Sequence, residues 1–126
     1  SLKKNLETQE FLFIVEHTKF LQTLHQYPRL RKIAEELRGR KEISLAIIFG
    51  SYAKGTVHSE SDIDVYLKTD DRKLKEELTL IDSKLSIKIG QLNLHAPLAK
   101  EIEKDHIIIK GVELYYEIIT AALERA

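Results

Sequence analysis

An apolar segment that stops at a Gly-Ser pair, with two aspartates in the next apolar segment, constrains the fold of this chain more than any other feature. Residues 43–49 are apolar at all but one position and lead directly into Gly50 and Ser51. Ten residues then separate Ser51 from Asp62, and Asp64 follows two positions later. A nearly unbroken apolar run is typical of a strand covered on both faces. The sequence therefore predicts a buried strand that ends at a turn, followed by an acidic strand.

The two aspartates share one face of the predicted acidic strand. Side chains two positions apart in a strand point to the same side, so Asp62, Asp64 and Tyr66 lie together. The alternate positions are apolar and form the opposite, buried face: Ile63, Val65 and Leu67. Neighbouring carboxylates repel each other, and such a pair usually needs a cation. The alternative interpretations are an ordinary turn for the Gly-Ser pair and a solvated strand edge for the aspartates.

The rest of the chain predicts a regular alternation of helices and strands. Periodicity and Pro or Gly positions predict helices at 6–25, 28–38, 51–55, 72–83, 97–105 and 112–124, and strands at 43–49, 62–69, 85–94 and 107–109. This order favours an α/β sandwich. In the first helix the spacing predicts one inward face, made of Phe11, Val15, Thr18, Leu21 and Leu24. Asp70 and Asp71 are predicted to cap the helix at 72–83.

The Gly-Ser and Asp-x-Asp pair resembles the signature of the nucleotidyltransferase superfamily with the DNA-polymerase-β-like fold. The chain is most similar to the minimal nucleotidyltransferases of bacteria and archaea, strongly over about residues 43–68 and more weakly to about 118. The resemblance implies a mixed sheet flanked by helices, in which the acidic strand lies beside the Gly-Ser strand. We therefore expect a nucleotidyltransferase domain over 42–126, preceded by a helical extension over 1–41 that packs on it.

Length and composition limit the remaining possibilities. The chain has 126 residues, which fits one structural domain, and its 20 basic and 20 acidic residues give no net charge. It contains no Cys and no long apolar segment, which fits a cytoplasmic protein without a membrane span. Met is absent as well, even at position 1, so we expect a piece of a longer chain. A charge-rich composition without Cys and Met favours an archaeal or thermophilic source.

The motif residues have chemical properties suited to phosphate and metal. Gly50 lets the backbone approach a phosphate, and Ser51 begins a helix whose amides favour an anion. Lys54 would add a positive charge to the same phosphates. Asp62 and Asp64 are predicted to be the catalytic pair and to hold Mg²⁺ or Mn²⁺, which bridges the triphosphate of an NTP, with ATP expected.

One position departs from the family pattern. Active members of the superfamily carry a third carboxylate on a neighbouring strand, and the matching position here is Lys88. Residues 85–94 contain no Asp or Glu, so a shift in alignment does not restore the carboxylate. Lys88 would compete with a second metal and could hold a phosphate instead. This departure affects catalysis more than nucleotide binding.

Other residues are weaker candidates. Tyr52, Tyr115 and Tyr116 are predicted to pack in the core rather than to bind a base or a partner. The histidines show no metal-ligand spacing and are predicted to be structural or exposed. One basic cluster is predicted to be mainly a solvated helix face, with nucleic acid or an acidic partner as the alternative: Arg29, Arg31, Lys32, Arg38, Arg40 and Lys41.

Two functions follow from these features. The first is a Mg²⁺-dependent nucleotidyltransferase that transfers an NMP from an NTP to an acceptor that the sequence does not identify, with a protein among the candidates. The second is a catalytically weak or inactive module that binds a nucleotide or a partner, as an antitoxin or as the regulatory half of a winged-helix protein. In either case the expected partner is a nucleotide and a toxin-like or regulatory protein. DNA would be contacted only through a further N-terminal module, and an oligomer is compatible with both functions.

Overall fold

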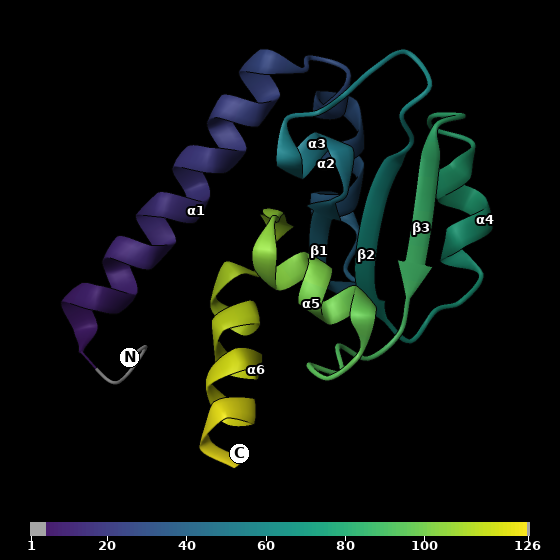
Figure 1. The fold of residues 1–126 in the computed structure, drawn as a ribbon. Helices are drawn as coiled ribbons and strands as arrows, with labels where there is room; N and C mark the ends of the chain where they lie inside the picture. The colour runs from purple at the N-terminus through teal and green to yellow at the C-terminus, as the bar shows by residue number, and fades with distance from the viewer. Residues whose placement is uncertain (1–4, 126) are drawn as a thin grey trace.

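The protein folds as a four-stranded mixed sheet flanked by helices, as a computed structural model that describes residues 5–125 shows (Figure 1). The helices are α1 (Leu6–Gln26), α2 (Leu30–Gly39), α3 (Ser51–Lys54), α4 (Leu74–Thr79), α5 (Pro97–Lys104) and α6 (Val112–Arg125). The strands are β1 (Ile43–Phe49), β2 (Ile63–Thr69), β3 (Leu85–Ile89) and β4 (Ile107–Lys110). The predicted order of elements is confirmed. No helix in the described range is long and apolar enough to cross a membrane.

The sheet places the two motif strands side by side. The strand order is β3-β2-β1-β4, with β1 antiparallel to β2 and β4, and with β2 parallel to β3. In the register of β1 and β2, Phe49 is opposite Asp64. Because Gly50 follows Phe49 directly, the turn after β1 lies next to the carboxylate on β2. The expected neighbourhood of the Gly-Ser strand and the acidic strand is therefore confirmed.

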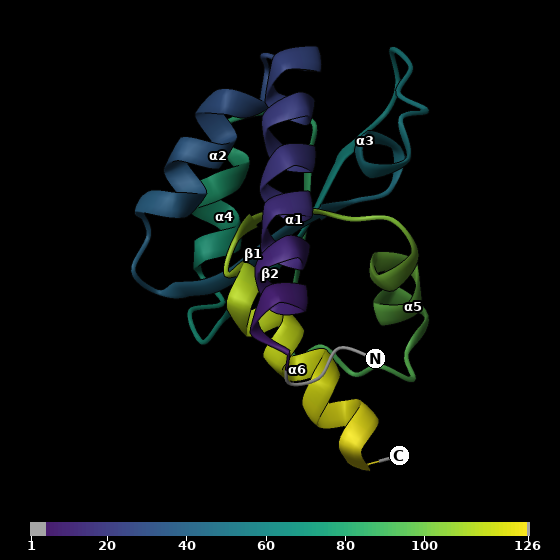
Figure 2. The same ribbon diagram turned by 90° about the vertical axis from the view of Figure 1, so that its left-hand side faces the viewer.

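Each face of the sheet is covered by its own set of helices (Figure 2). Ile63, Val65 and Leu67 are buried against α2 and α4, as the alternation in β2 predicts. The opposite face carries Tyr66, which is buried against α5 and α6, and its hydroxyl donates to the Gly90 carbonyl at 2.6 Å. The face that contains the acidic residues is therefore covered at Tyr66. It is more open at the beginning of β2, where Asp62 is exposed and Asp64 is partly exposed.

Helix α1 is buried on a different side from the one that its apolar spacing predicts. Of the five residues predicted to point inward, only Leu24 is buried, whereas Phe11, Val15 and Leu21 are 67%, 52% and 64% exposed. The buried side consists of Phe20 and Leu24 together with two polar residues, Glu16 and Thr23. The prediction fails because tertiary partners satisfy the buried polar groups, and a pattern of apolar residues does not contain that information.

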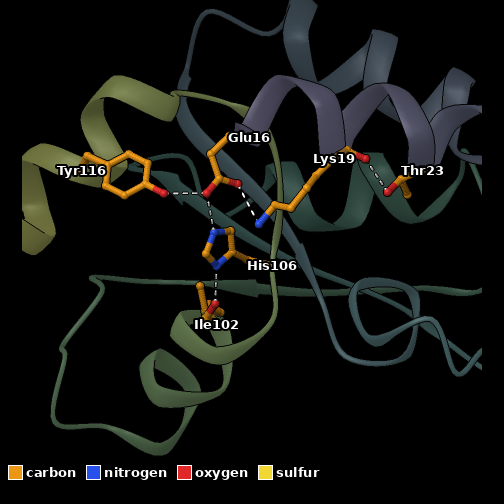
Figure 3. A network of polar contacts seen from close by, with 6 residues as sticks. All are labelled: Glu16, Lys19, Thr23, Ile102, His106 and Tyr116. Carbon is orange, nitrogen blue, oxygen red and sulfur yellow. Dashed lines mark hydrogen bonds and ion pairs between the residues drawn. The ribbon is translucent and has the colours of Figure 1, made fainter. Parts of the chain in front are cut away.

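The buried carboxylate of Glu16 joins α1 to His106, which lies just before β4, and to Tyr116 in α6 (Figure 3). Its Oε2 accepts a hydrogen bond from the Tyr116 hydroxyl at 2.5 Å and lies 3.0 Å from Nε2 of His106. The Lys19 ammonium forms an ion pair with Oε1 at 2.9 Å. Nδ1 of His106 donates to the Ile102 carbonyl at 2.7 Å, because a carbonyl can only accept. His106 is therefore structural, as predicted.

The predicted ends of α4 and β3 also need correction. Helix α4 spans Leu74–Thr79 rather than 72–83, and neither Asp70 nor Asp71 caps it. The Oδ1 of Asp71 accepts from the Lys73 amide at 3.0 Å in a turn before the helix. Asp and Asn side chains favour such turns as strongly as helix caps. Strand β3 ends at Ile89, five residues before the predicted end. The Gly90 carbonyl is hydrogen-bonded to Tyr66, so the chain leaves the sheet at that point.

Candidate functional site

The turn after β1 has a backbone conformation that requires glycine. Gly50 has φ 68° and ψ −147°, a combination that residues with a side chain rarely adopt. Its carbonyl accepts hydrogen bonds from the amides of Ala53 and Lys54, at 3.1 and 3.0 Å. These bonds form the single turn of α3, which begins at Ser51. The turn thus starts α3 directly after β1.

Asp64 lies directly against this turn. A Cβ atom built on Gly50 would be 2.3 Å from Oδ2 of Asp64 and 3.1 Å from its carboxyl carbon. Glycine is therefore needed at position 50 for space as well as for its backbone angles. This close approach brings the Gly-Ser pair and the Asp-x-Asp pair into one site, although ten residues separate Ser51 from Asp62 in the sequence.

The link between the two motifs is held at its end. Ser61 is buried, and its hydroxyl accepts from the His58 amide at 2.9 Å. Asp62 follows directly and is exposed, one residue before β2 begins. The strand predicted for 62–69 therefore begins one residue later than expected.

The site carries excess negative charge at Asp64. Burial raises the pKa of the Asp64 carboxyl above its ordinary value, and the negative charges of Asp62 and Glu101 raise that pKa further. The positive charges of Lys88 and Lys54 act in the opposite direction and do not compensate fully. A carboxylate in such surroundings is stabilised by a bound cation.

The residues present fit a divalent metal that is shared with a ligand. In residues 5–125 no three His, Cys, Asp or Glu side chains come together as a metal cage. Mg²⁺ is commonly held by one or two carboxylates and completes its coordination with phosphate oxygens and water. Asp62 and Asp64 supply the two carboxylates, and the uncompensated charge at Asp64 is the structural feature that suits such an ion.

Strand β3, which lies beside β2, carries no carboxylate. Its register with β2 places two of its residues, Ser86 and Lys88, on the same face as Asp64. Ser86 is paired directly with Asp64, whereas Lys88 is paired with Tyr66, one step further along the strands. Lys88 is exposed, and its charge acts on Asp64. The residue nearest to Asp64 along the sheet is therefore Ser86 rather than Lys88. The alternation in β3 places both on one face, but only the register distinguishes them.

Helix α5 contributes an acidic residue that the sequence did not identify as part of the site. Glu101 lies 3.9 Å from the Lys54 ammonium through its Oε1, and both side chains are about half exposed, at 42% and 44%. Glu101 also raises the pKa of Asp64. No local signal distinguishes Glu101 from Glu103, the other acidic residue of α5, because its position depends on how α5 packs over the sheet.

The remaining sequence candidates have structural roles. Tyr52 is buried and packs edge-on against Tyr27, with ring centroids 5.0 Å apart, and Tyr115 is buried in the core. Tyr116 is partly buried and binds Glu16. Much of the basic cluster is engaged within the protein: Arg29 pairs with Asp82, Arg40 with Glu36 and Glu77, and Arg38 with the Ile109 carbonyl and the Phe20 ring.

This combination of a mixed sheet, a Gly-Ser turn and an adjacent acidic strand defines a nucleotidyltransferase type of domain. The family described as Polymerase beta, Nucleotidyltransferase matches residues 31–117, which is more than half of the chain. The chain therefore belongs to this nucleotidyltransferase family. The match begins within α2, so α1 lies before it.

One solved structure agrees with this assignment at the level of the fold. A structure described as a toxin-antitoxin with AMP-PNP is similar with a TM-score of 0.51 and 20% sequence identity, over 78% of this chain and 86% of that one. A mutant of the toxin-antitoxin MntA-HpeT is similar with a TM-score of 0.49 and 20% identity, over 75% of this chain and 91% of that one. The comparison with curated proteins gives no match.

Proposed function

We propose that the domain binds an NTP together with Mg²⁺ or Mn²⁺ and transfers its NMP moiety to an acceptor hydroxyl. The acceptor oxygen bonds to the α-phosphorus and loses its proton, and the bond between the α- and β-phosphates breaks, so that pyrophosphate leaves. The observation that carries this proposal is the contact between the Gly50 turn and Asp64, where a Cβ would be 2.3 Å from the carboxylate. A phosphate bound at the turn would lie beside a metal bound at Asp64. Membership of the nucleotidyltransferase family supports the same reaction.

The chain's own residues would position and neutralise the triphosphate. Gly50 leaves room for a phosphate beside the backbone, and Ser51 offers a hydroxyl and the amides at the beginning of α3. Lys54 would bind the same phosphates after leaving Glu101, and Lys88 would add a second positive charge at the edge of the site. Asp62 and Asp64 would hold the metal, which would supply positive charge to offset the negative charge that develops during transfer.

We propose ATP as the NTP and a protein as the acceptor or partner. The structure described as a toxin-antitoxin with AMP-PNP contains an ATP analogue and belongs to a two-component assembly, which makes both choices reasonable for a chain of similar fold. In this proposal residues 1–41 extend the nucleotidyltransferase domain of 42–126, and the protein acts in the cytoplasm.

The second candidate function is a nucleotide-binding or partner-binding module without turnover, such as an antitoxin that masks its toxin. The observation that favours it is the composition of β3, where Ser86 and Lys88 occupy the acidic face and no carboxylate is present. Without a third carboxylate, deprotonation of the acceptor and binding of a second metal would both be weaker.

Labelling with radioactive nucleotide distinguishes the two functions. The protein is incubated with each α-³²P-labelled NTP, Mg²⁺ or Mn²⁺ and an extract of the source organism, beside the double variant Asp62→Ala/Asp64→Ala. Transfer predicts a labelled protein or RNA that depends on metal and disappears with the variant. Metal-dependent NTP binding by calorimetry without any labelled product would instead support the second function. The absence of NTP binding would contradict the transferase and the nucleotide-binding form of the second function, and would leave only a module that binds a protein partner.

A further inference from the structure

The outward side of α1 carries a continuous apolar surface that the rest of the chain does not cover. Figure 2 shows α1 in front of the sheet, with one side turned entirely away from the other elements. The exposed residues on this side, which we call the outer stripe, are Phe11, Ile14, Val15, Thr18 and Leu21. Its four large apolar side chains are between 52% and 67% exposed.

The outer stripe differs from scattered surface hydrophobics because its residues recur at helical spacing. They follow one another at steps of three, one, three and three positions, which places them in a single band along about three turns. The buried side of the same helix contains Glu16 and Thr23 beside Phe20 and Leu24, so α1 leaves a large part of its apolar surface in solvent. A contiguous exposed apolar surface commonly marks an interaction site.

The outer stripes of two copies of α1 are complementary when the two helices run antiparallel. An antiparallel pairing in which the two residue numbers add to 32 places Phe11 opposite Leu21 and Ile14 opposite Thr18. The same pairing places Glu7 opposite His25 at both ends of the stripe, and both residues are exposed. An acidic group thus meets a basic group twice, once at each end. A two-fold interface requires this property, because each contact must occur twice.

We propose that two copies of this chain associate through α1, with the two helices antiparallel and the outer stripes in contact. Val15 lies near the two-fold axis of this pair. Phe11 packs against Leu21 of the second copy, and Ile14 packs against its Thr18. Spacings of three and four residues along the stripe suit side-by-side packing of two helices.

The proposed dimer leaves the nucleotidyltransferase site accessible. Helix α1 packs against β4, at one edge of the sheet, whereas Asp64 lies on β2 with β1 between them. The inference therefore does not depend on the proposed function. The shared surface is one side of a single helix, which is smaller than the roughly 1,600 Å² of a standard interface, so we expect a dissociation constant of about 10 µM.

Sedimentation tests the association and its surface. Equilibrium ultracentrifugation across the micromolar range should give a monomer–dimer equilibrium for the wild type, and Leu21→Glu should raise the dissociation constant more than about 30-fold. Leu80→Glu is a matched control, because Leu80 is 89% exposed and lies at the end of α4, away from the stripe. Glu7→Lys should weaken the dimer, and Glu7→Lys/His25→Glu should restore it. A wild type that stays monomeric throughout, or equal effects of Leu21→Glu and Leu80→Glu, would overturn the proposal.

Disulfide trapping tests the direction of the helices. The chain has no Cys, so introduced thiols are the only ones present. Val15→Cys should cross-link to itself under mild oxidation, and a mixture of Phe11→Cys and Leu21→Cys should form the mixed dimer. Phe11→Cys alone should not, because ten residues along the helix place the two thiols about 15 Å apart. Cross-linking of Phe11→Cys alone without the mixed product would indicate parallel helices and contradict the proposal.

Discussion

Gly50 and Asp64 are in such close contact that any side chain at position 50 would displace the Asp64 carboxylate. A Cβ atom there would be 2.3 Å from Oδ2 of Asp64, and the φ of 68° already disfavours a side chain. The Asp64 carboxylate therefore occupies the space that a side chain at position 50 would need, although the two residues belong to separate motifs in the sequence. A change at the glycine must move the carboxylate, and this displacement would change the position of a bound metal relative to the phosphates.

Gly50→Ala should destabilise the domain by about 3 kcal/mol, because backbone strain of about 1–3 kcal/mol adds to the displacement of Asp64. Gly55→Ala is the matched control: Gly55 also has a positive φ, of 76°, but a Cβ there meets nothing within 4 Å. Its cost should be about 1–2 kcal/mol from the left-handed conformation alone. Urea denaturation of both variants measures the difference, and calorimetry should detect nucleotide binding only in Gly55→Ala. Equal losses of stability would contradict the contact described above.

Asp64→Asn should stabilise the metal-free domain while it weakens metal binding. Burial, Asp62 and Glu101 all raise the pKa of Asp64 above its ordinary value, so the ionised carboxylate is disfavoured in the folded state. Above that pKa, removal of the charge relieves the penalty; at low pH, where the carboxyl is protonated in both folded and unfolded chains, the benefit should disappear. Thermal melts in EDTA at pH 7 and pH 3 check the sign. A lower melting temperature for Asp64→Asn at pH 7 would exclude this explanation.

Ser86→Asp should create a stronger metal site than Lys88→Asp does. Ser86 is paired with Asp64, so a carboxylate there joins the existing pair directly, whereas position 88 is one step further along β3. We expect about a tenfold gain in Mn²⁺ affinity for Ser86→Asp and a smaller one for Lys88→Asp, which acts mainly by removing a positive charge. Without metal, Ser86→Asp should lower the melting temperature, and Mn²⁺ should restore it.

Metal titration followed by electron paramagnetic resonance gives the affinity and the number of bound ions for both variants. If Lys88→Asp gives the larger gain in Mn²⁺ affinity, then the third carboxylate of the family corresponds to position 88. In that case the pairing of Ser86 with Asp64 does not identify the metal-binding position on β3.

Glu101→Gln should slightly strengthen nucleotide binding. Glu101 lies 3.9 Å from the Lys54 ammonium, and a bound phosphate would have to compete with it. Exposed ion pairs contribute about 0.2–1 kcal/mol, so the affinity for an NTP should rise about twofold at low salt. Glu103→Gln, on the same helix, is the control for the change in net charge. If instead the affinity falls only when Mg²⁺ is present, Glu101 is a metal ligand rather than a competitor.

The sequence predicted those parts of the structure that depend on local patterns. The order of elements and the buried side of β2 follow from local periodicity, whereas the neighbourhood of the Gly-Ser strand and the acidic strand was implied by the family resemblance. The first two features depend on neighbours in the sequence. They are the features for which periodicity is informative.

The remaining features depend on contacts that no local pattern encodes. Helix α1 was predicted to bury its apolar stripe, but it buries Glu16 because His106 and Tyr116, from the other end of the chain, satisfy the carboxylate. Glu101 reaches the site through the packing of α5, and Ser86 is identified only by the register of β3. In each case the decisive partner is distant in sequence.

The Glu16 carboxylate should make the stability of the domain depend on pH in the acid range. Burial alone would raise its pKa, but hydrogen bonds from His106, Tyr116 and Lys19 outweigh it and lower the pKa from 4.5 to about 2. Because the pKa of Glu16 is lower in the folded chain than in the unfolded chain, its ionised carboxylate stabilises the fold. This contribution is fully present above the pKa of the unfolded chain, 4.5, and is lost as the pH falls from there through about 2. The size of this contribution is about 3 kcal/mol, from 1.36 kcal/mol for each pKa unit.

Glu16→Gln should therefore be less stable than the wild type at pH 7, and the gap should close as the pH approaches 2. Glu10→Gln is the control, because Glu10 is exposed on the same helix. Urea denaturation at pH 7, 4, 3 and 2 measures the free energy of unfolding of all three proteins. The network also joins α1 to α6 through Tyr116, so Tyr116→Phe should cost part of the same energy by removing one donor. A gap between wild type and Glu16→Gln that is as wide at pH 2 as at pH 7 would mean that the charge of Glu16 does not hold α1 in place.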